Sequence, residues 1–180
     1  MILTETHLLG AFLIEPEPIR DYRGFFARVF CRSELAARGL CPDVDQCSVS
    51  FNAQRGTLRG MHFQVGAHAE DKIVRVTAGA IFDVIVDVRP QSATFRQWFG
   101  AELTAENRTA LYVPKGFAHG FLTLVDATEV YYMISAPFAP GSGRGFRWDD
   151  PEVAISWPLA PAVISERDAS YPLLSSLSGE

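Results

Sequence analysis

The sequence is short of cysteine, of positive charge and of long apolar runs, and each shortage excludes a class of protein. The three cysteines, Cys31, Cys41 and Cys47, lack the spacing of zinc ligands, and their odd number disfavours a disulfide framework. We therefore expect unpaired thiols in a reducing cytosol. The net charge of −5 argues against nucleic acid as the main partner. A small anionic ligand is compatible with this charge, because a few inward-facing cations act locally.

The first segment, residues 1–18 (MILTETHLLGAFLIEPEP), does not have the composition of a targeting or anchoring sequence. It lacks a basic start, carries Glu5 early, and contains no uncharged run long enough to cross a membrane. We therefore expect a cytoplasmic protein with no membrane partner, in which this segment forms a pair of short strands.

The composition is that of a folded protein, with 48% apolar residues, 21% charged residues and thirteen phenylalanines. A length of 180 residues suffices for one domain with a sizeable core, and no repeat or linker divides the chain. We expect a single domain over residues 1–180. Within it, residues 1–30 supply N-terminal strands, and the Pro- and Ser-rich residues 160–180 wrap the surface.

Apolar and polar residues alternate along much of the chain, which is typical of strands. In AIFDVIVDVR, residues 80–89, the alternation places Phe82 and Val84 on one face and Ile81 and Asp83 on the other. Glycine and proline separate many such runs, which favours an antiparallel sandwich or jelly roll. One helix is expected in CRSELAARGL, residues 31–40, with Ser33 as its cap and Gly39 at its end.

The strand-like run GTLRGMHFQ, residues 56–64, carries two costly polar side chains, Arg59 and His62. Strict alternation places them on opposite faces, and they share a face only if the strand bulges, which Gly60 permits. A lone buried histidine usually bonds to a backbone carbonyl. His119 is a second histidine within a strand-like run. Two such histidines, accompanied by Arg59, Lys72 and Asp83, favour a functional site over two unrelated core histidines.

A metal site is the next alternative. Jelly rolls of the cupin type commonly bind a metal through a His-x-His motif together with a later Glu and a later His. Here the motif reads His62-Phe63-Gln64, and an amide oxygen is a poor ligand for metals that suit imidazole. We therefore expect a metal-free site.

Seven motifs occur in one order along the chain and together carry a family resemblance. They are RGFF (23–26), GTLRGMHFQ (56–64), KIVRVTAGAIFDVIVDVRP (72–90), YVPKGFAHGF (112–121), RWDDP (147–151), ISWP (155–158) and SERD (165–168). In this order they resemble the dTDP-4-dehydrorhamnose 3,5-epimerase family, which builds deoxysugars for bacterial polysaccharides and antibiotics. The resemblance spans residues 10–172.

The resemblance implies an all-β, double-stranded β-helix (a cupin jelly roll) with one or two short helices, forming a homodimer. It implies a nucleotide-linked 4-keto-6-deoxyhexose as substrate, bound inside the barrel without metal or redox cofactor. His62 matches the family's general base, and Asp168 of SERD matches its carboxylate partner. The positions that match substrate-binding residues are Arg23, Phe26, Gln46, Arg59, Lys72, Asp83, His119 and Phe138.

The implied chemistry suits these residue types. A ketone acidifies the hydrogens on both neighbouring carbons, and neutral imidazole is a good base for them near pH 7. Lysine and arginine near the ketone oxygen stabilise the resulting enolate. Reprotonation from the opposite face, by a tyrosine in this family, inverts the carbon.

The sequence departs from the family pattern where that acid is expected. The family has tyrosine in a Tyr-x-Pro context, and here the aligned stretch APFAP places Phe138 there. Either Tyr131 or Tyr132 can stand in, but adjacent strand residues face opposite ways, so at most one points inward. Arg28 and Ser48 also replace a family glutamate and asparagine.

Three functions are therefore compatible with the sequence. The first is an epimerase, which inverts either both carbons beside the ketone or, with Phe138 in place of the acid, only one. The second is a sugar 3,4-ketoisomerase of similar fold. The third is a non-catalytic nucleotide-sugar binding module.

Overall fold

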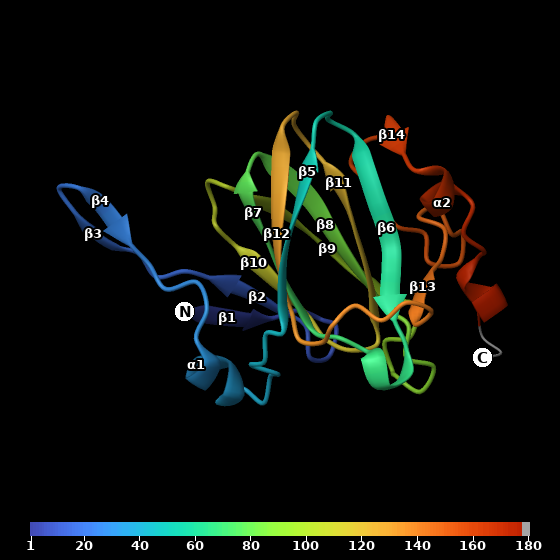
Figure 1. Ribbon diagram of the computed structural model, residues 1–180, viewed down its shortest axis with the longest axis horizontal. Helices are drawn as coiled ribbons and strands as arrows, with labels where there is room; N and C mark the ends of the chain where they lie inside the picture. The colour runs from blue at the N-terminus through green and yellow to red at the C-terminus, as the bar shows by residue number, and fades with distance from the viewer. Residues whose placement is uncertain (178–180) are drawn as a thin grey trace.

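The structure, a computed structural model, describes residues 1–177 and consists mainly of two facing β-sheets (Figure 1). The first sheet has six strands in the order β1 (Ile2–Glu5), β2 (Phe12–Glu15), β10 (Ala110–Val113), β7 (Lys72–Ala78), β12 (Thr128–Ile134) and β5 (Gln46–Asn52). The second has the order β13 (Gly143–Gly145), β6 (Thr57–Gln64), β11 (Phe117–Thr123), β8 (Ala80–Asp87) and β9 (Trp98–Thr104), with β14 (Val163–Ile164) parallel to β6.

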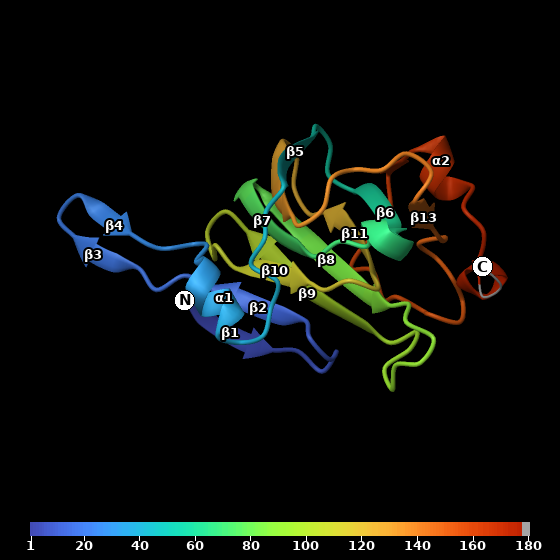
Figure 2. The same cartoon turned by 60° about the horizontal axis from the view of Figure 1, so that its bottom comes forward.

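A third, two-stranded sheet forms an arm. Its strands, β3 (Ile19–Asp21) and β4 (Gly24–Phe26), extend away from the body, whereas the C-terminal segment lies at the opposite end (Figures 1 and 2). The helical elements of the described residues are short: α1 (Arg32–Ala36), η1 (Gly66–His68), α2 (Glu166–Ala169) and η2 (Leu174–Leu177). The prediction of an all-β protein with one or two short helices is confirmed.

The alternation read in β8 is confirmed and explains how the layers pack. Ile81 and Ile85 are fully buried in the core between the two sheets. Val84 and Val86 point the other way, into a second core that includes Phe146 and Leu174. The second sheet therefore packs apolar side chains on both of its faces, because the C-terminal segment covers its outer side.

The C-terminal segment is attached to this outer side by buried polar contacts. The Asp150 carboxylate, 2% exposed, accepts hydrogen bonds from the backbone amides of Leu174 (2.7 Å) and Glu152 (2.9 Å). Residues 178–180 of the expected wrapping segment lie outside the described residues. The attachment matters for the site, because this segment supplies Asp168.

The helix in CRSELAARGL is present, but its expected cap is wrong. The N-cap residue is Cys31, with extended backbone, and no side chain caps the helix. Ser33 instead lies within the first turn, where its hydroxyl is 3.2 Å from the Cys31 sulfur. The helix ends at Ala36, with Ala37 as its C-cap, which is earlier than the expected end at Gly39. Gly39 lies in the turn that follows and adopts φ +70°, a conformation that favours glycine.

The three cysteines are all free, as expected from their spacing. Among residues 1–177, no helix is long and apolar enough to cross a membrane.

Candidate active site

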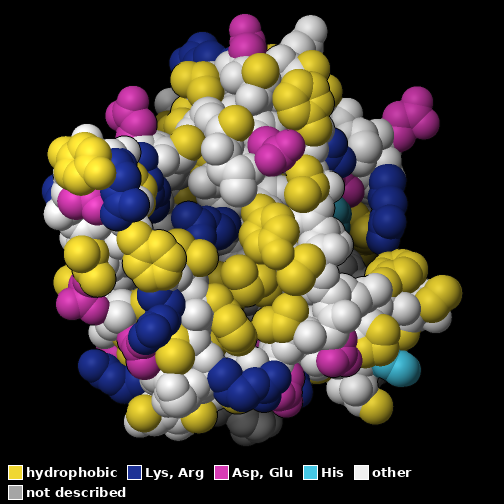
Figure 3. Space-filling view, turned by 60° about the vertical axis from the view of Figure 1, so that its left-hand side comes forward, with side chains coloured by type: hydrophobic (Ala, Val, Ile, Leu, Met, Phe, Trp, Pro, Cys, Tyr) yellow, Lys and Arg dark blue, Asp and Glu magenta, His cyan; other side chains and the backbone are white. Residues whose placement is uncertain are grey.

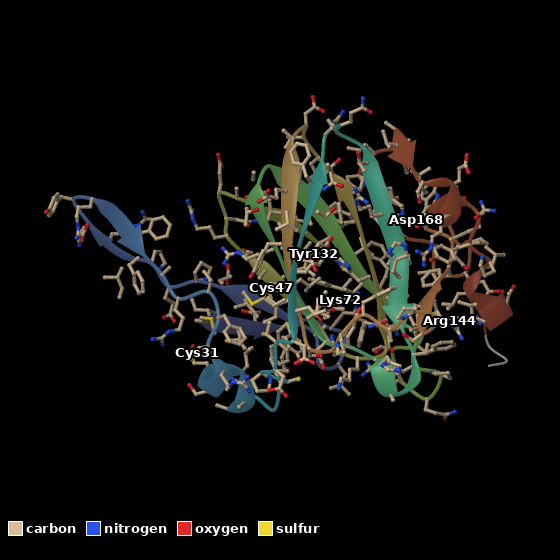
Figure 4. The ribbon with its side chains drawn as sticks, viewed as in Figure 1. Cys31, Cys47, Lys72, Tyr132, Arg144 and Asp168 are labelled. Carbon is tan, nitrogen blue, oxygen red and sulfur yellow. The ribbon has the colours of Figure 1, made fainter. Side chains whose placement is uncertain are left out.

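A cavity of about 620 Å³ opens between the two sheets and collects most of the polar residues singled out in the sequence. Figure 4 shows Lys72 and Tyr132 between β12 and β6, with Asp168 on the side of β6 that faces α2. The predicted site residues that line the cavity are Gln46, Arg59, His62, Lys72, His119, Phe138 and Asp168.

A bulge in β6 brings Arg59 and His62 to the same cavity. His119 of β11 pairs with His62, but Phe121 pairs with Arg59, so the register shifts by one residue between these pairs. Gly60 lies at the shift with φ +140°, and a Cβ there would come within 2.5 Å of the Gly120 Cα. Only glycine fits such a position. The bulge, which the sequence analysis gave as the condition for Arg59 and His62 to share a face, is therefore present.

His62 forms a hydrogen-bonded pair with Asp168. Its Nε2 lies 2.8 Å from the Asp168 Oδ1, and the carboxylate side chain is only 7% exposed. The second carboxylate oxygen accepts the Gly60 backbone N–H at 3.1 Å. Burial alone raises the pKa of the Asp168 carboxyl, but the His62 hydrogen bond and charge, with the Gly60 amide, hold that pKa below its usual value.

The local sequence explains why Asp168 is so well placed. Ser165 caps α2, and its hydroxyl accepts the backbone N–H of Asp168 at 3.1 Å. Residues 165–168 are thereby fixed against β6, so the carboxylate reaches the histidine from a neighbouring element. An ionised aspartate in this position can orient the imidazole, and it would stabilise an imidazolium if His62 took a proton.

A second histidine–aspartate pair lies on the neighbouring strands. His119 Nε2 is 2.7 Å from the Asp83 Oδ1 of β8, and the Asp83 side chain is fully buried. Asp83 stands behind His119 and does not itself line the cavity, whereas His119 does. The other oxygen of Asp83 has no hydrogen-bond partner among the described residues.

The structure distinguishes the two tyrosines that the sequence could not separate. Tyr132 lines the cavity, edge-on to His119 with ring centroids 6.1 Å apart, whereas Tyr131 is absent from the lining. Burial, and then the nearby Asp83 charge, raise the pKa of Tyr132, although Arg59 opposes them, so its hydroxyl stays protonated at neutral pH. Phe138 lies at the mouth and is 69% exposed.

Arg59 is held in place by a neighbouring strand. Its Nε donates to the Asn52 Oδ1 at 2.8 Å, and Asn52 is only 2% exposed. The rest of the guanidinium is free to face the cavity that Arg59 lines. Asn52 was not expected from the sequence, because its contact with Arg59 depends on how the two sheets that contain β5 and β6 face each other.

Lys72 is paired with a residue that the sequence analysis missed, Glu70. The Lys72 Nζ lies 2.8 Å from the Glu70 Oε1, and both side chains are nearly buried in the cavity wall. Gln64, interpreted from the sequence only as a lost metal ligand, donates to the Glu70 Oε2 at 2.6 Å. The spacing of Glu70 and Lys72 was the available signal, since residues two apart in an extended chain share a face.

Two further cations at the cavity, Arg144 and Arg167, were also missed. They lie in segments without strand periodicity, where sequence patterns say little about direction. In contrast, Arg23 and Phe26 do not reach this cavity, because both lie on the β3–β4 arm. Among residues 1–177, no group of three or more His, Cys, Asp or Glu side chains is arranged to hold a metal ion.

Comparisons with known proteins identify similar sequences and structures. The sequence matches the dTDP-4-dehydrorhamnose 3,5-epimerase family over residues 5–176. It is 46% identical over 170 residues to the Sinorhizobium fredii dTDP-4-dehydrorhamnose 3,5-epimerase, covering 92% of this chain and 85% of that protein. The Bacillus anthracis dTDP-4-dehydrorhamnose 3,5-epimerase structure, with TDP and PPi bound, superimposes with a TM-score of 0.91 at 42% identity, covering 96% and 98% of the two chains.

A third structure is informative about the site. It is a 3'-monoepimerase from Streptomyces bikiniensis in complex with dTDP, with a TM-score of 0.89 and 31% identity over 97% of this chain and 88% of that one. The crystallised variant has a histidine replaced by asparagine and a tyrosine by phenylalanine, 70 positions apart, which is also the spacing of His62 and Tyr132. These neighbours confirm the predicted cupin jelly roll.

Proposed function

This chain belongs to the dTDP-4-dehydrorhamnose 3,5-epimerase family, and we propose that it inverts a carbon beside the ketone of a dTDP-linked 4-keto-6-deoxyhexose. It is an isomerase of deoxysugar biosynthesis. The observation that carries the proposed reaction is the placement of His62 and Tyr132. They come from different sheets, β6 and β12, and both line one cavity.

The reaction begins with proton removal. His62 takes the proton from the carbon beside the ketone, and Asp168 stabilises the imidazolium that forms. The electron pair of the broken C–H bond moves into the enolate, whose oxygen is stabilised by Lys72 and Arg59. Tyr132 then donates its hydroxyl proton to the same carbon from the other side. Return of a proton from the imidazolium to the tyrosinate, through solvent, resets the site.

This arrangement favours inversion over the two alternatives. A 3,4-ketoisomerase must deliver a proton to the former carbonyl carbon, and a base and an acid on opposite walls suit inversion at one carbon better. A binding module needs neither the His62–Asp168 pair nor a protonated tyrosine opposite it. The ordered acid–base pair therefore supports catalysis.

Solvent exchange separates the three functions. The protein is incubated in D2O with a dTDP-4-keto-6-deoxyhexose, and the products are followed by NMR. An epimerase introduces deuterium beside the ketone and yields an inverted sugar. A binding module exchanges nothing, and a ketoisomerase moves the carbonyl; either result overturns the proposal.

We also propose that two copies of the chain form a homodimer through the arm. Tyr22, Ile19 and Phe26 are 97%, 73% and 73% exposed on a two-stranded hairpin. An isolated hairpin is at best marginally stable in water, so these apolar side chains need a cover. Figure 3 brings this side of the molecule forward and shows hydrophobic side chains interspersed with Lys and Arg across it.

A second copy would also give Arg23 a function. Its side chain is 74% exposed and pairs with Asp21 on the same arm, so it can reach outward to the diphosphate of a nucleotide in a neighbouring cavity. Analytical ultracentrifugation at micromolar protein tests this. A fully active monomer would overturn the dimer, and Arg23→Ala that leaves the substrate KM unchanged would overturn the contact.

A further inference from the structure

The wall of the cavity contains a hydrogen-bond network whose direction is fixed at every step. It begins at the loop of residues 135–142, which carries Phe138 at the cavity mouth. The backbone N–H of Ala139 donates to the Gln64 Oε1 at 3.1 Å. The Gln64 Nε2 then donates to the Glu70 Oε2 at 2.6 Å, and the Lys72 Nζ lies 2.8 Å from the other oxygen, Oε1.

The donors and acceptors of this network allow only one orientation of the Gln64 amide. A backbone amide can only donate, so the Gln64 carbonyl oxygen must face Ala139 and its NH2 group must face Glu70. Glu70 thus receives donors on both of its oxygens, from Gln64 and from Lys72. An ionised carboxylate accepts at both oxygens, whereas an amide accepts at only one. The structure therefore requires an acid at position 70.

The burial of the network shows that it is not a surface ion pair. The side chains of Lys72 and Glu70 are 13% and 10% exposed, and Gln64 is 7% exposed. A carboxylate in a cavity that takes an anionic substrate is costly on charge grounds alone, because it repels the diphosphate and the enolate. Its presence therefore needs an organising role.

We propose that Gln64 and Glu70 are positioning residues that hold the Lys72 ammonium toward the reacting ketone and connect it to the loop at the cavity mouth. This inference rests on the proposed function, in which Lys72 stabilises the enolate. A lysine side chain has four rotatable bonds, and fixing it before the reaction removes an entropic cost from the transition state. Donors that are preorganised stabilise developing charge most strongly.

The connection to the mouth gives the network a second consequence. The adjacent Phe138 N–H donates to the Gln46 Oε1 at 2.8 Å, so the loop is bonded to both β5 and β6. A substrate that contacts this loop is thereby linked through Gln64 to the lysine. Binding at the mouth and placement of the ammonium are parts of one bonded unit.

Two single variants and the double variant test the direction of the hydrogen bonds between Gln64, Glu70 and Lys72. Glu70→Gln presents an NH2 group to a donor, and Gln64→Glu places two carboxylates side by side. We expect each to lower kcat for exchange by roughly tenfold to a hundredfold, the scale of a small misplacement, with little change in KM. In the double variant the acid at position 64 accepts from Ala139 and from the amide at position 70, whose oxygen accepts from Lys72.

The double variant should therefore recover most of the lost kcat, with a residual deficit because the His68 carbonyl loses the Gln64 donor at 3.2 Å. Glu102→Gln, on the exposed side of β9, is the matched control and should leave kcat unchanged. Thermal unfolding verifies that each variant is folded. A double variant no better than Glu70→Gln, or a Glu70→Gln variant with wild-type kcat, overturns the proposal.

A mutant cycle separates positioning of Lys72 from a general structural role. If Glu70 acts through Lys72, Glu70→Gln should cause no further loss of kcat in a Lys72→Met background. An equal loss in both backgrounds would show that Glu70 only supports the fold and would overturn the proposal.

A measurement without substrate keeps this inference separate from the proposed reaction. The ammonium protons of a fixed, bonded lysine exchange slowly with water and can be followed by nitrogen-15 NMR. We expect a Lys72 signal in the wild type that is lost in Glu70→Gln and recovered in the double variant. Absence of that pattern overturns the positioning role, whereas a wild type that catalyses no exchange overturns the proposed function alone.

Discussion

His62 and Tyr132 line the same cavity from two different sheets, one on β6 and the other on β12. In the proposed reaction, a sugar ring between them has a base on one side and an acid on the other. We propose that His62 removes a proton and Tyr132 returns one, so a substitution at either residue should block only its own step.

The base half of the reaction is tested at His62 and Asp168. His62→Ala should abolish deuterium incorporation beside the ketone, because His62 is the proposed base. Asp168→Asn should lower incorporation by roughly two to four orders of magnitude, since the imidazolium loses its counter-charge. Exchange is measured by NMR per folded molecule. Wild-type exchange in His62→Ala would show that the histidine only fills the core.

The acid half is tested at Tyr132. Tyr132→Phe should retain exchange while inversion falls by roughly two orders of magnitude or more, because the enolate can recover a proton only from His62 or solvent. Tyr131→Phe is the matched control on the same strand, outside the cavity lining, and should invert normally. If the two variants behave alike, Tyr132 is not the acid.

Much of the fold was predictable because strand alternation and glycine position are local signals. The two faces of β8 were read correctly from its own residues, and the bulge at Gly60 was foreseen as a condition for joining Arg59 to His62. The choice between Tyr131 and Tyr132 was not predictable, because only the placement of β12 beside β5 and β7 decides which side chain faces the cavity. Glu70 was missed for a similar reason: its partners, Gln64 and Lys72, lie in different sheets.

Activity should survive exhaustive chelation. Gln64, in place of a ligand histidine, is already bonded through both ends of its amide to Glu70 and Ala139, so it is not available to a metal. The measurement is exchange after dialysis against EDTA, with elemental analysis of the protein. Stoichiometric transition metal, together with activity lost on its removal and regained on its return, would contradict the expectation.

Acid stability should depend on Asp87, which does not line the cavity. Its carboxylate is fully buried. Although burial raises the pKa, hydrogen bonds from Arg89, Ser92 and Thr94 lower that pKa to about 2. The pKa of Asp87 in the folded protein lies below the unfolded value of about 3.9. At pH values above about 3.9, the ionised carboxylate therefore stabilises the fold by roughly 2 kcal/mol. This contribution is lost as pH falls through about 2.

Asp87→Asn should consequently be less stable than the wild type at neutral pH, and the difference should shrink as the pH approaches 2. Urea unfolding at several pH values between 7 and about 2 measures this. Asp43→Asn, at an exposed ion pair with Arg32, is the control and should change little. A stability difference that does not vary with pH would show that Asp87 contributes through packing alone.

Phe138 tests how many carbons are inverted. The family resemblance places an acid tyrosine at this position, but here the ring lies at the mouth, 69% exposed, and carries no hydroxyl. In the proposed reaction Tyr132 is the acid, so we expect at least one carbon to be inverted without Phe138. If the second carbon needs a donor at the mouth, the wild type exchanges hydrogen at that carbon faster than it inverts the carbon, since His62 returns the proton to its original face.

Phe138→Tyr should then raise the inverted fraction at that carbon, measured by NMR of the product mixture, while exchange stays constant. A wild type that inverts both carbons as fast as it exchanges them, with Phe138→Tyr changing neither rate, would show that Tyr132 serves both centres and that Phe138 is a contact of the mouth alone.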